Sequence, residues 1–269
     1  MLETIKETIS YVSDKAGPDH EVGIILGTGL GGLVREIDIS HTLSYRDIPN
    51  FPVSTVEGHK GRLIFGTLAG KKVVAMQGRF HFYEGYSMQE VTFPVRVFKY
   101  LGIKHLMVSN ASGGVNPEYE IGDLMILNDH INLLPNPLIG KNNEELGPRF
   151  PDMSEPYDHD MITGAMSIAR KHNIRIHQGC YVGVTGPTLE TPREYMYFRI
   201  IGGDTVGMST VPEIIVARQM GIPCFAISII TDLGVPGRIV KVTHEDVQVA
   251  AEQAEPEMTL IMKELLQAL

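Results

Sequence analysis

The chain has 269 residues, of which 43% are hydrophobic and 20% are charged, and it carries a formal net charge of −9. That composition is typical of a globular protein with a full hydrophobic core, and the length suits one large α/β domain. The negative charge disfavours sequence-independent binding of nucleic acid, because that activity needs a basic face.

The N-terminal residues 1–15 combine apolar side chains at helical spacing with acidic residues between them. This pattern predicts an amphipathic surface helix rather than a signal peptide. No apolar stretch approaches the roughly 20 residues that span a bilayer, so we expect no membrane partner. The chain has two cysteines, Cys180 and Cys224, and no Cys/His cluster with metal-ligand spacing. We therefore expect a reducing, cytoplasmic location and no metal site.

Strands and helices are predicted to alternate along the rest of the chain. Short runs rich in β-branched and aliphatic residues predict strands over 22–26, 62–68, 72–77, 105–110, 123–127, 179–184 and 223–230. Helical periodicity and first-turn prolines predict helices over 87–101, 158–172, 192–201 and 212–221. A last helix starts at Thr243, and Pro256 is expected to kink or split it. Together these elements predict one α/β domain over residues 1–269 with a largely buried sheet.

The first predicted strand runs into a glycine-rich turn, Gly-Thr28-Gly-Leu-Gly-Gly, at residues 27–32. Glycines allow the backbone to approach an anion closely, and Thr28 adds a hydroxyl donor. The same residues also fit the dinucleotide pattern GxGxxG of dehydrogenases, which requires a following helix, a second strand and an acidic residue. Residues 35–52 show no convincing second buried strand, which disfavours the dinucleotide interpretation.

The segment after the strand at 72–77 places Arg79, His81 and Tyr83 at alternate positions. In an extended chain, side chains two apart share a face, so these three would point into one space. Cationic donors beside a hydroxyl suit an anion such as phosphate next to a sugar. A solvated strand edge is the alternative interpretation of this segment.

Segments spread over nearly the whole chain resemble the trimeric purine nucleoside phosphorylases. They are, in order, GTGLGG (27–32), IPNFPVSTVEGHKGRLIFG (48–66), MQGRFHFYEGY (76–86), VTFPVRVFKYLG (91–102), SNASGGVNP (109–117), GDLMILNDHINL (122–133), GPRFPDMS (147–154), TGPTLETP (185–192) and GMSTVPEIIVAR (207–218). The resemblance implies phosphate-dependent cleavage of purine (2′-deoxy)ribonucleosides to free base and (deoxy)ribose 1-phosphate. It also implies a mixed sheet, partly closed into a distorted barrel and flanked by helices, a homotrimer, and no metal or organic cofactor.

The resemblance assigns phosphate binding to Thr28, Arg79, His81, Ser209 and the backbone N–H of Ala111. Arginine suits an anion because its forked donors make charge-assisted hydrogen bonds, which are roughly twice as strong as neutral ones. For Ser209, the N-cap of the helix that contains Pro212 is an alternative role, and the two roles can coexist.

By the same resemblance, Tyr83, Met208 and His244 contact the ribose, and His59 lies near the site entrance. Phe150 matches an aromatic residue that reaches into the neighbouring subunit's site. It lies in the long connection 132–156, which is rich in Pro, Asn and Gly, and such loops are usually functional or contact a partner. For His244, an exposed position in the first turn of the last helix is the alternative.

The expected base pocket departs from the family pattern. Glu190 matches the carboxylate that accepts hydrogen bonds from the purine ring N–H and 2-amino group, whereas Asp232 stands where relatives acting on 6-oxopurines usually have asparagine. An ionised carboxylate only accepts hydrogen bonds. Asp232 therefore either is protonated and donates to N7 as a general acid, or accepts from a 6-amino group. Leu189 replaces an aromatic residue, which weakens stacking on the base.

Catalytic roles are accordingly expected for His81, Glu190 and Asp232, with guanosine and inosine as substrates and adenosine as a further candidate. A methylthioadenosine or adenosine phosphorylase is the alternative within the family. The polar His244 suits a 5′-hydroxyl better than a methylthio tail, which favours the first interpretation. A non-catalytic nucleoside-binding protein with the same fold is the alternative outside enzymes.

Overall fold

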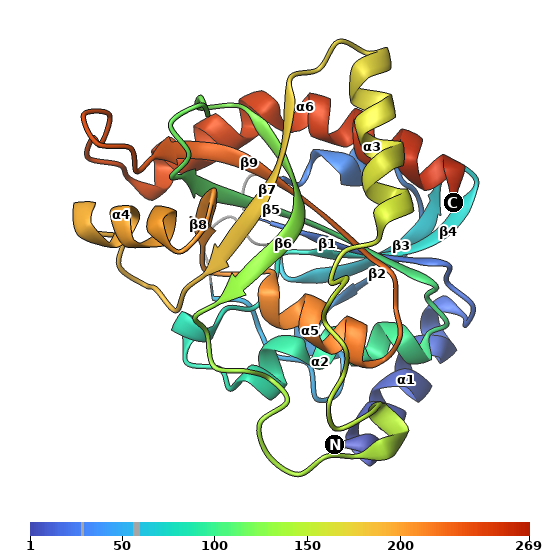
Figure 1. Ribbon diagram of the computed structural model, residues 1–269. Coiled ribbons are helices and arrows are strands. Elements are labelled where there is room, and N and C mark those ends of the chain that lie inside the picture. Colours follow the sequence, from blue (N-terminus) through green and yellow to red (C-terminus); the bar gives the residue numbers. More distant parts are fainter. Residues whose placement is uncertain (28–29, 56–59) are drawn as a thin grey trace.

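The computed structural model describes residues 1–27, 30–55 and 60–269 (Figure 1). Its strands are β1 (Val22–Leu26), β2 (Asp38–Ser44), β3 (Arg62–Leu68), β4 (Lys71–Gln77), β5 (His105–Gly114), β6 (Leu124–Asn132), β7 (Ile176–Gly183), β8 (Thr205–Gly207) and β9 (Cys224–Leu233). Its α-helices are α1 (Leu2–Ala16), α2 (Met88–Tyr100), α3 (His159–Lys171), α4 (Pro192–Ile200), α5 (Val211–Gln219) and α6 (His244–Ala268). The predicted α/β fold is confirmed.

The strands form one mixed sheet, part of which closes on itself. The order is β2-β3-β4-β1-β5-β8-β7-β6-β9, and β9 also pairs with β5, so the last five strands form a closed barrel. The neighbours β4, β1, β5 and β9 are parallel, whereas β2, β3 and β4 form an antiparallel extension. The ten-residue strand β5 belongs to both parts, because its first half pairs with β1 and its end pairs with β8. The partly closed barrel that the family resemblance implies is therefore confirmed.

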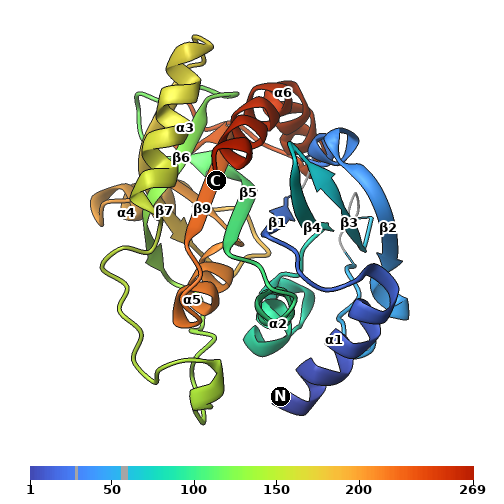
Figure 2. The ribbon, with the colours of Figure 1, turned by 90° about the vertical axis from the view of Figure 1, so that its right-hand side faces the viewer.

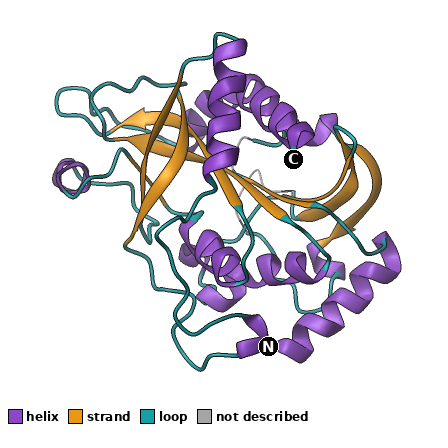
Figure 3. Cartoon of the chain, turned by 45° about the vertical axis from the view of Figure 1, so that its right-hand side comes forward, coloured by secondary structure: helices purple, strands orange, loops and turns teal. Residues whose placement is uncertain are grey.

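Helices cover both sides of the sheet (Figures 1 and 2). On one side α1 packs against α2 and α2 against α5, and on the other side α3 packs against α6. Figure 3 shows the strands enclosed between these two groups of helices, as expected for a sheet whose central strands are continuous apolar runs. None of the helices in the described ranges is long and apolar enough to cross a bilayer.

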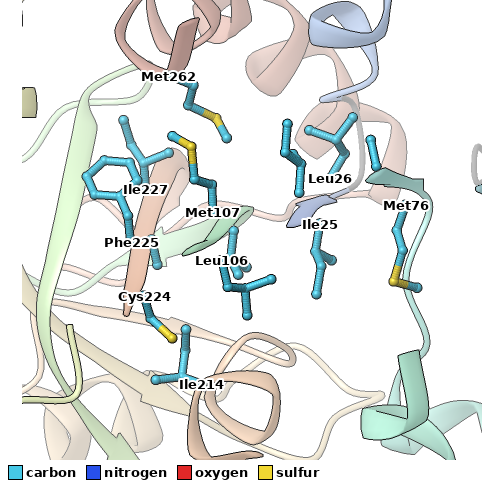
Figure 4. Packing of buried hydrophobic residues seen from close by; sticks show 14 of the residues in the cluster. Ile25, Leu26, Met76, Leu106, Met107, Ile214, Cys224, Phe225, Ile227 and Met262 are labelled. Atoms are coloured by element: carbon cyan, nitrogen blue, oxygen red, sulfur yellow. The ribbon is translucent and has the colours of Figure 1, made fainter. Parts of the chain in front are cut away.

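The central strands are buried on both faces. Every residue of β1 and of β9 is buried. Figure 4 shows Met262 of α6 on one side of these strands and Ile214 of α5 on the other, with Met107 and Phe225 among the side chains between them. Burial of one such side chain contributes about 1.5–3 kcal/mol. This two-sided core holds the strand ends in fixed positions.

The structure excludes a split of the last helix at Pro256 and adds two strands. Helix α6 is continuous through Pro256 and is not split there. Pro256 and Glu252 both lie on the exposed side of α6, so the Glu252 carbonyl that loses its helical donor can bond water. Strand β2 is an exposed edge strand and β8 has three residues, so neither has the apolar run that signals a buried strand.

Candidate active site

A cavity lies at the carboxyl ends of the parallel strands. Strands β4, β1, β5 and β9 point the same way, so the residues that end or follow them meet at one edge of the sheet. This edge brings Gly27, Arg79, Ala111 and Asp232 to the wall of a cavity of about 530 Å³. That volume falls in the range of small-molecule sites, roughly 300–1,000 Å³.

Arg79, His81 and Tyr83 line this cavity together. We expected an extended segment to bring the three side chains to one face. His81 is extended, but Tyr83 lies in a 3₁₀ turn. That turn stacks the Tyr83 ring on the His81 ring, with 4.7 Å between centroids, while Phe80 faces the core. Arg79 and His81 are 1% and 6% exposed, so the alternative of a solvated strand edge is wrong.

A buried carboxylate holds the Arg79 guanidinium. Nε and Nη2 of Arg79 lie 3.2 and 3.1 Å from the two oxygens of Glu213, which is 3% exposed. Nη1 donates to the carbonyl of Ser109 (2.9 Å) and to the hydroxyl of Ser209 (3.1 Å). The Nε contact is a hydrogen bond and the Nη2 contact an ion pair, and together with the Nη1 bonds they hold the guanidinium on several sides. Arg79 is thus presented to the cavity in one orientation.

Ser209 lines the cavity beside Arg79, but it is not the N-cap of α5. The N-cap is Thr210, whose φ of 66° is unusual for a β-branched residue. The Thr210 hydroxyl accepts a hydrogen bond from Nδ2 of Asn110 (2.9 Å). Such backbone strain persists where surrounding contacts hold it, and it is concentrated at functional sites.

Glu84 sets the hydrogen-bonding state of His81. One Glu84 oxygen accepts from the His81 backbone N–H (2.8 Å) and lies 3.1 Å from Nδ1, and the other accepts from the Thr55 hydroxyl (2.6 Å). Burial acts to raise the pKa of Glu84, but hydrogen bonds from His81 and Thr55 lower it to about 2. The ionised carboxylate can only accept, so Nδ1 of His81 carries a hydrogen. Burial also lowers the pKa of His81, and the neutral ring then keeps Nε2 as a proton acceptor.

The glycine turn after β1 packs closely against β5. A Cβ at Gly27 would lie 2.9 Å from the carbonyl oxygen of Ser109, so glycine is required there. Residues Gly32–Glu36 form a 3₁₀ helix that leads into β2, an antiparallel edge strand. A dinucleotide fold needs an α-helix and a parallel strand at this place, which argues against that interpretation. Thr28 and His59 lie outside the described residues.

Two carboxyl groups also line the cavity, Glu190 before α4 and Asp232 near the end of β9. Asp232 is 6% exposed, and its oxygens accept hydrogen bonds from the hydroxyls of Thr231 (3.1 Å) and Tyr195 (3.3 Å). Desolvation raises the pKa of both carboxyls, and the nearby Asp232 charge raises that of Glu190 further. A raised pKa favours the protonated form of a carboxyl group, and perturbed pKa values of this kind are concentrated at functional sites.

The residues expected to contact ribose are not all in one place. Tyr83, Met208 and His244 line the cavity, as does Leu189, which is 48% exposed. His244 is also the exposed first residue of α6, so the two interpretations of it are compatible. Phe150 lies apart from this lining. It is 87% exposed in the connection between β6 and α3, where it borders a separate surface hollow.

Three residues of the site, Glu84, Tyr195 and Glu213, were not predicted from the sequence. Glu84 could have been found, because an acid three residues after His81 can reach it on the same turn. Tyr195 and Glu213 contact partners 37 and 134 residues away in the chain. Contacts at such separations leave no local pattern in the sequence.

The described part of the cavity suits an anion together with a polar ring. Arg79, Ser209 and His81 offer donors and a proton acceptor for the anion, and Glu190 and Asp232 offer carboxyl groups for the ring. Across the described residues, no group of three or more His, Cys, Asp or Glu side chains is arranged to hold a metal ion.

Comparison with known proteins places this arrangement in a family. A family model for the phosphorylase superfamily matches residues 21–267. Purine nucleoside phosphorylase 1 of Bacillus subtilis is 48% identical over 267 residues, which are 99% of this chain and 98% of the relative. The rat purine nucleoside phosphorylase is 44% identical over 98% of this chain and 95% of its own length. The crystal structure of Schistosoma mansoni purine nucleoside phosphorylase with adenosine superposes with a TM-score of 0.95 at 43% identity, covering 100% of this chain and 98% of that one. The chain belongs to the purine nucleoside phosphorylases of the phosphorylase superfamily.

Proposed function

We propose that this chain cleaves the N-glycosidic bond of purine (2′-deoxy)ribonucleosides with inorganic phosphate, without a metal or organic cofactor. The observation that carries the proposal is that Arg79, His81 and Ser209 share one cavity with Glu190 and Asp232. The first three residues suit a phosphate, and the two carboxyl groups suit the polar edge of a purine. The products are the free base and (deoxy)ribose 1-phosphate.

The residues divide the work of the reaction. Cleavage through an oxocarbenium-like transition state leaves positive charge on the sugar and negative charge on the departing purine. Arg79, Ser209 and the backbone of Ala111 hold phosphate against the anomeric carbon, and such positioning can supply several kcal/mol of the barrier. His81 accepts a proton from the phosphate through its neutral ring. With a 6-oxopurine, a protonated Asp232 donates to N7 as the base leaves.

Substrate choice is proposed to include 6-oxopurines and to extend to 6-aminopurines. Glu190 accepts hydrogen bonds from the ring N–H of guanine and hypoxanthine, which adenine lacks, whereas an ionised Asp232 accepts from a 6-amino group. Solved structures of Schistosoma purine nucleoside phosphorylase, at 42–43% identity, contain adenosine, hypoxanthine, inosine or guanosine. That range in a relative supports guanosine and inosine as substrates of this chain, with adenosine as a third.

The test is release of free base from inosine, guanosine, adenosine and methylthioadenosine, each with and without phosphate. Phosphate-dependent release from inosine and guanosine is the expected result. Release from the 6-aminopurine nucleosides alone would instead identify a methylthioadenosine or adenosine phosphorylase. Saturable binding of nucleoside without any release of base would identify a non-catalytic binding protein.

Replacing Asp232 with asparagine is expected to shift preference towards 6-oxopurines. The amide can donate to a 6-carbonyl or to N7, which an ionised carboxylate cannot do. One buried hydrogen bond gained or lost is worth about 1–2 kcal/mol, so the ratio of inosine to adenosine turnover should rise about 10-fold. Measured kcat/KM for both nucleosides checks this. An unchanged ratio would rule out Asp232 as a determinant of specificity.

We propose further that the enzyme is a cytoplasmic homotrimer in which Phe150 reaches a neighbouring subunit's cavity. The Phe150 ring is 87% exposed and lies beside Ile139, which is 70% exposed, and two such apolar side chains together support contact with another subunit at this loop. The cytoplasmic location is proposed because the two free cysteines suit a reducing compartment. Light scattering is expected to give three times the 29.7 kDa chain mass, and Phe150→Ala to raise KM for nucleoside. A monomeric mass with full activity would contradict the assembly.

A further inference from the structure

Tyr195 is held rigidly with its hydroxyl against the two carboxyl groups of the cavity. It lies on α4, is 5% exposed, and packs in a small cluster with Val182, Phe198 and Val206. Its ring lies directly over Gly234, because a Cβ at that glycine would come within 2.2 Å of the ring. The hydroxyl donates to Oδ2 of Asp232 at 3.3 Å. A side chain packed in this way directs its hydroxyl at Asp232 from behind the cavity wall.

The same hydroxyl also acts on Glu190. Hydrogen bonding from Tyr195 lowers the pKa of Glu190 against a larger rise from desolvation, and burial together with the two carboxylates raises the pKa of Tyr195 itself. Tyr195 thus remains a neutral phenol, with one hydrogen to share between two carboxyl groups. Its position between them links the two groups that are proposed to read the purine.

The contacts of Asp232 leave it set up as an acceptor. Oδ1 accepts from the Thr231 hydroxyl and Oδ2 from the Tyr195 hydroxyl. On β5, a Cβ at Gly113 would lie 2.9 Å from Oδ2, so the carboxyl group sits in space that a glycine leaves open. Two hydroxyl donors favour the ionised form, whose remaining lone pairs can accept from a 6-amino group.

We propose that Tyr195 is a positioning residue that holds Asp232 as a hydrogen-bond acceptor and so extends the enzyme's range to 6-aminopurines. This inference rests on the proposed phosphorylase function. It differs from the role of Asp232 itself, since Tyr195 acts through Asp232 and comes from a different element, α4. Removing its hydroxyl should favour protonated Asp232 and hence 6-oxopurines.

The effect of pH should follow the same logic. Desolvation raises the pKa of Asp232, and hydrogen bonds from Thr231 and Tyr195 lower it. The groups that face Asp232 are these two hydroxyls, the Glu190 carboxyl group and the backbone of Gly113. Loss of the Tyr195 donor raises the pKa of Asp232 further. Adenosine turnover needs the ionised form of Asp232, so it falls as the pH is lowered. In Tyr195→Phe this fall should begin at a higher pH than in the wild type.

The experiment compares Tyr195→Phe with wild type for kcat/KM on adenosine and inosine across pH. The ring packing is retained, and the adenosine-to-inosine ratio is expected to fall about 10-fold. Tyr119→Phe is the matched control, because it removes a phenol that is also buried (2% exposed) and whose hydroxyl bonds only weakly, at 3.4 Å, to the Gln178 carbonyl. Calorimetry on the same variants measures the affinities for adenine and hypoxanthine, and the ratio of these affinities reports base preference without relying on turnover.

A second arm repeats Tyr195→Phe in an Asp232→Asn background. If Tyr195 acts through Asp232, the change in ratio should vanish there. An unchanged ratio in the single variant, or an equal change in both backgrounds, would overturn the inference. Wild-type protein that releases no base from any nucleoside would overturn the proposed function instead, so the two failures are distinguishable.

Discussion

Replacing Arg79 with lysine is expected to lower kcat/KM for phosphate about 10²- to 10³-fold, corresponding to about 3–4 kcal/mol. Lysine keeps the positive charge but loses the fork. The guanidinium is 1% exposed and engages Glu213 through Nε and Nη2 while Nη1 reaches Ser209. A single ammonium group cannot span both sides of this arrangement, so the phosphate loses an oriented, charge-assisted donor.

The matched control for this variant is Arg62→Lys. Arg62 is half-buried on β3, its Nε donates to the Gln77 side chain (2.7 Å), and it is not among the residues that line the cavity with Arg79. Its replacement should leave kcat/KM for phosphate within about threefold of wild type, as expected for a weak polar contact. Equal losses in the two lysine variants would mean that Arg79 has no special part in phosphate binding.

Part of the site was predictable because it depends on the order of residues along single segments. The alternate spacing of Arg79, His81 and Tyr83 follows an apolar strand, and residues that follow parallel strands meet at one sheet edge. The spacing identified the right residues, but the extended backbone on which that prediction rested is present only as far as His81. Tyr83 reaches the cavity through the 3₁₀ turn that Glu84 closes, and not through an extended chain.

The central strands were predictable because each is a local apolar run, whereas the closure of the barrel was not predictable. Strands β1 and β9 are continuous apolar runs because helices cover both faces of the sheet. The barrel closes through β8, whose three residues Thr205–Gly207 pair with β5 and β7. A strand of that length has no detectable period, and its pairing is decided by residues far away in the chain.

The contacts that orient the site were beyond local reasoning altogether. Glu213 follows Pro212 in the first turn of α5, where an acid is ordinarily explained by the helix dipole. In the fold it instead points to Arg79, 134 residues away. The strained Thr210 that precedes this turn has no sequence signature either, since a β-branched residue is a poor choice for positive φ. Tertiary contacts therefore decide both the partner of Glu213 and the backbone conformation of Thr210, against what the local sequence favours.

Replacing Glu213 with alanine is expected to lower the free energy of unfolding by about 3–5 kcal/mol. The variant leaves the Arg79 guanidinium buried without its carboxylate partner, and Glu213 itself is 3% exposed, so water does not easily take its place. Chemical denaturation measures the loss, and the melting temperature should fall by roughly 6–15 °C. Glu257→Ala, on the exposed side of α6, is the control and should change stability by less than about 0.5 kcal/mol.

The double replacement Arg79→Met with Glu213→Leu separates stability from function. Apolar side chains of similar volume often replace a buried ion pair at no cost, so the double variant should regain most of the stability that Glu213→Ala loses. It should still bind no phosphate, because the oriented guanidinium is gone. Failure to regain stability would mean that the pair holds the fold together. Recovery without activity would mean that the buried pair is kept because it aims Arg79 at the cavity.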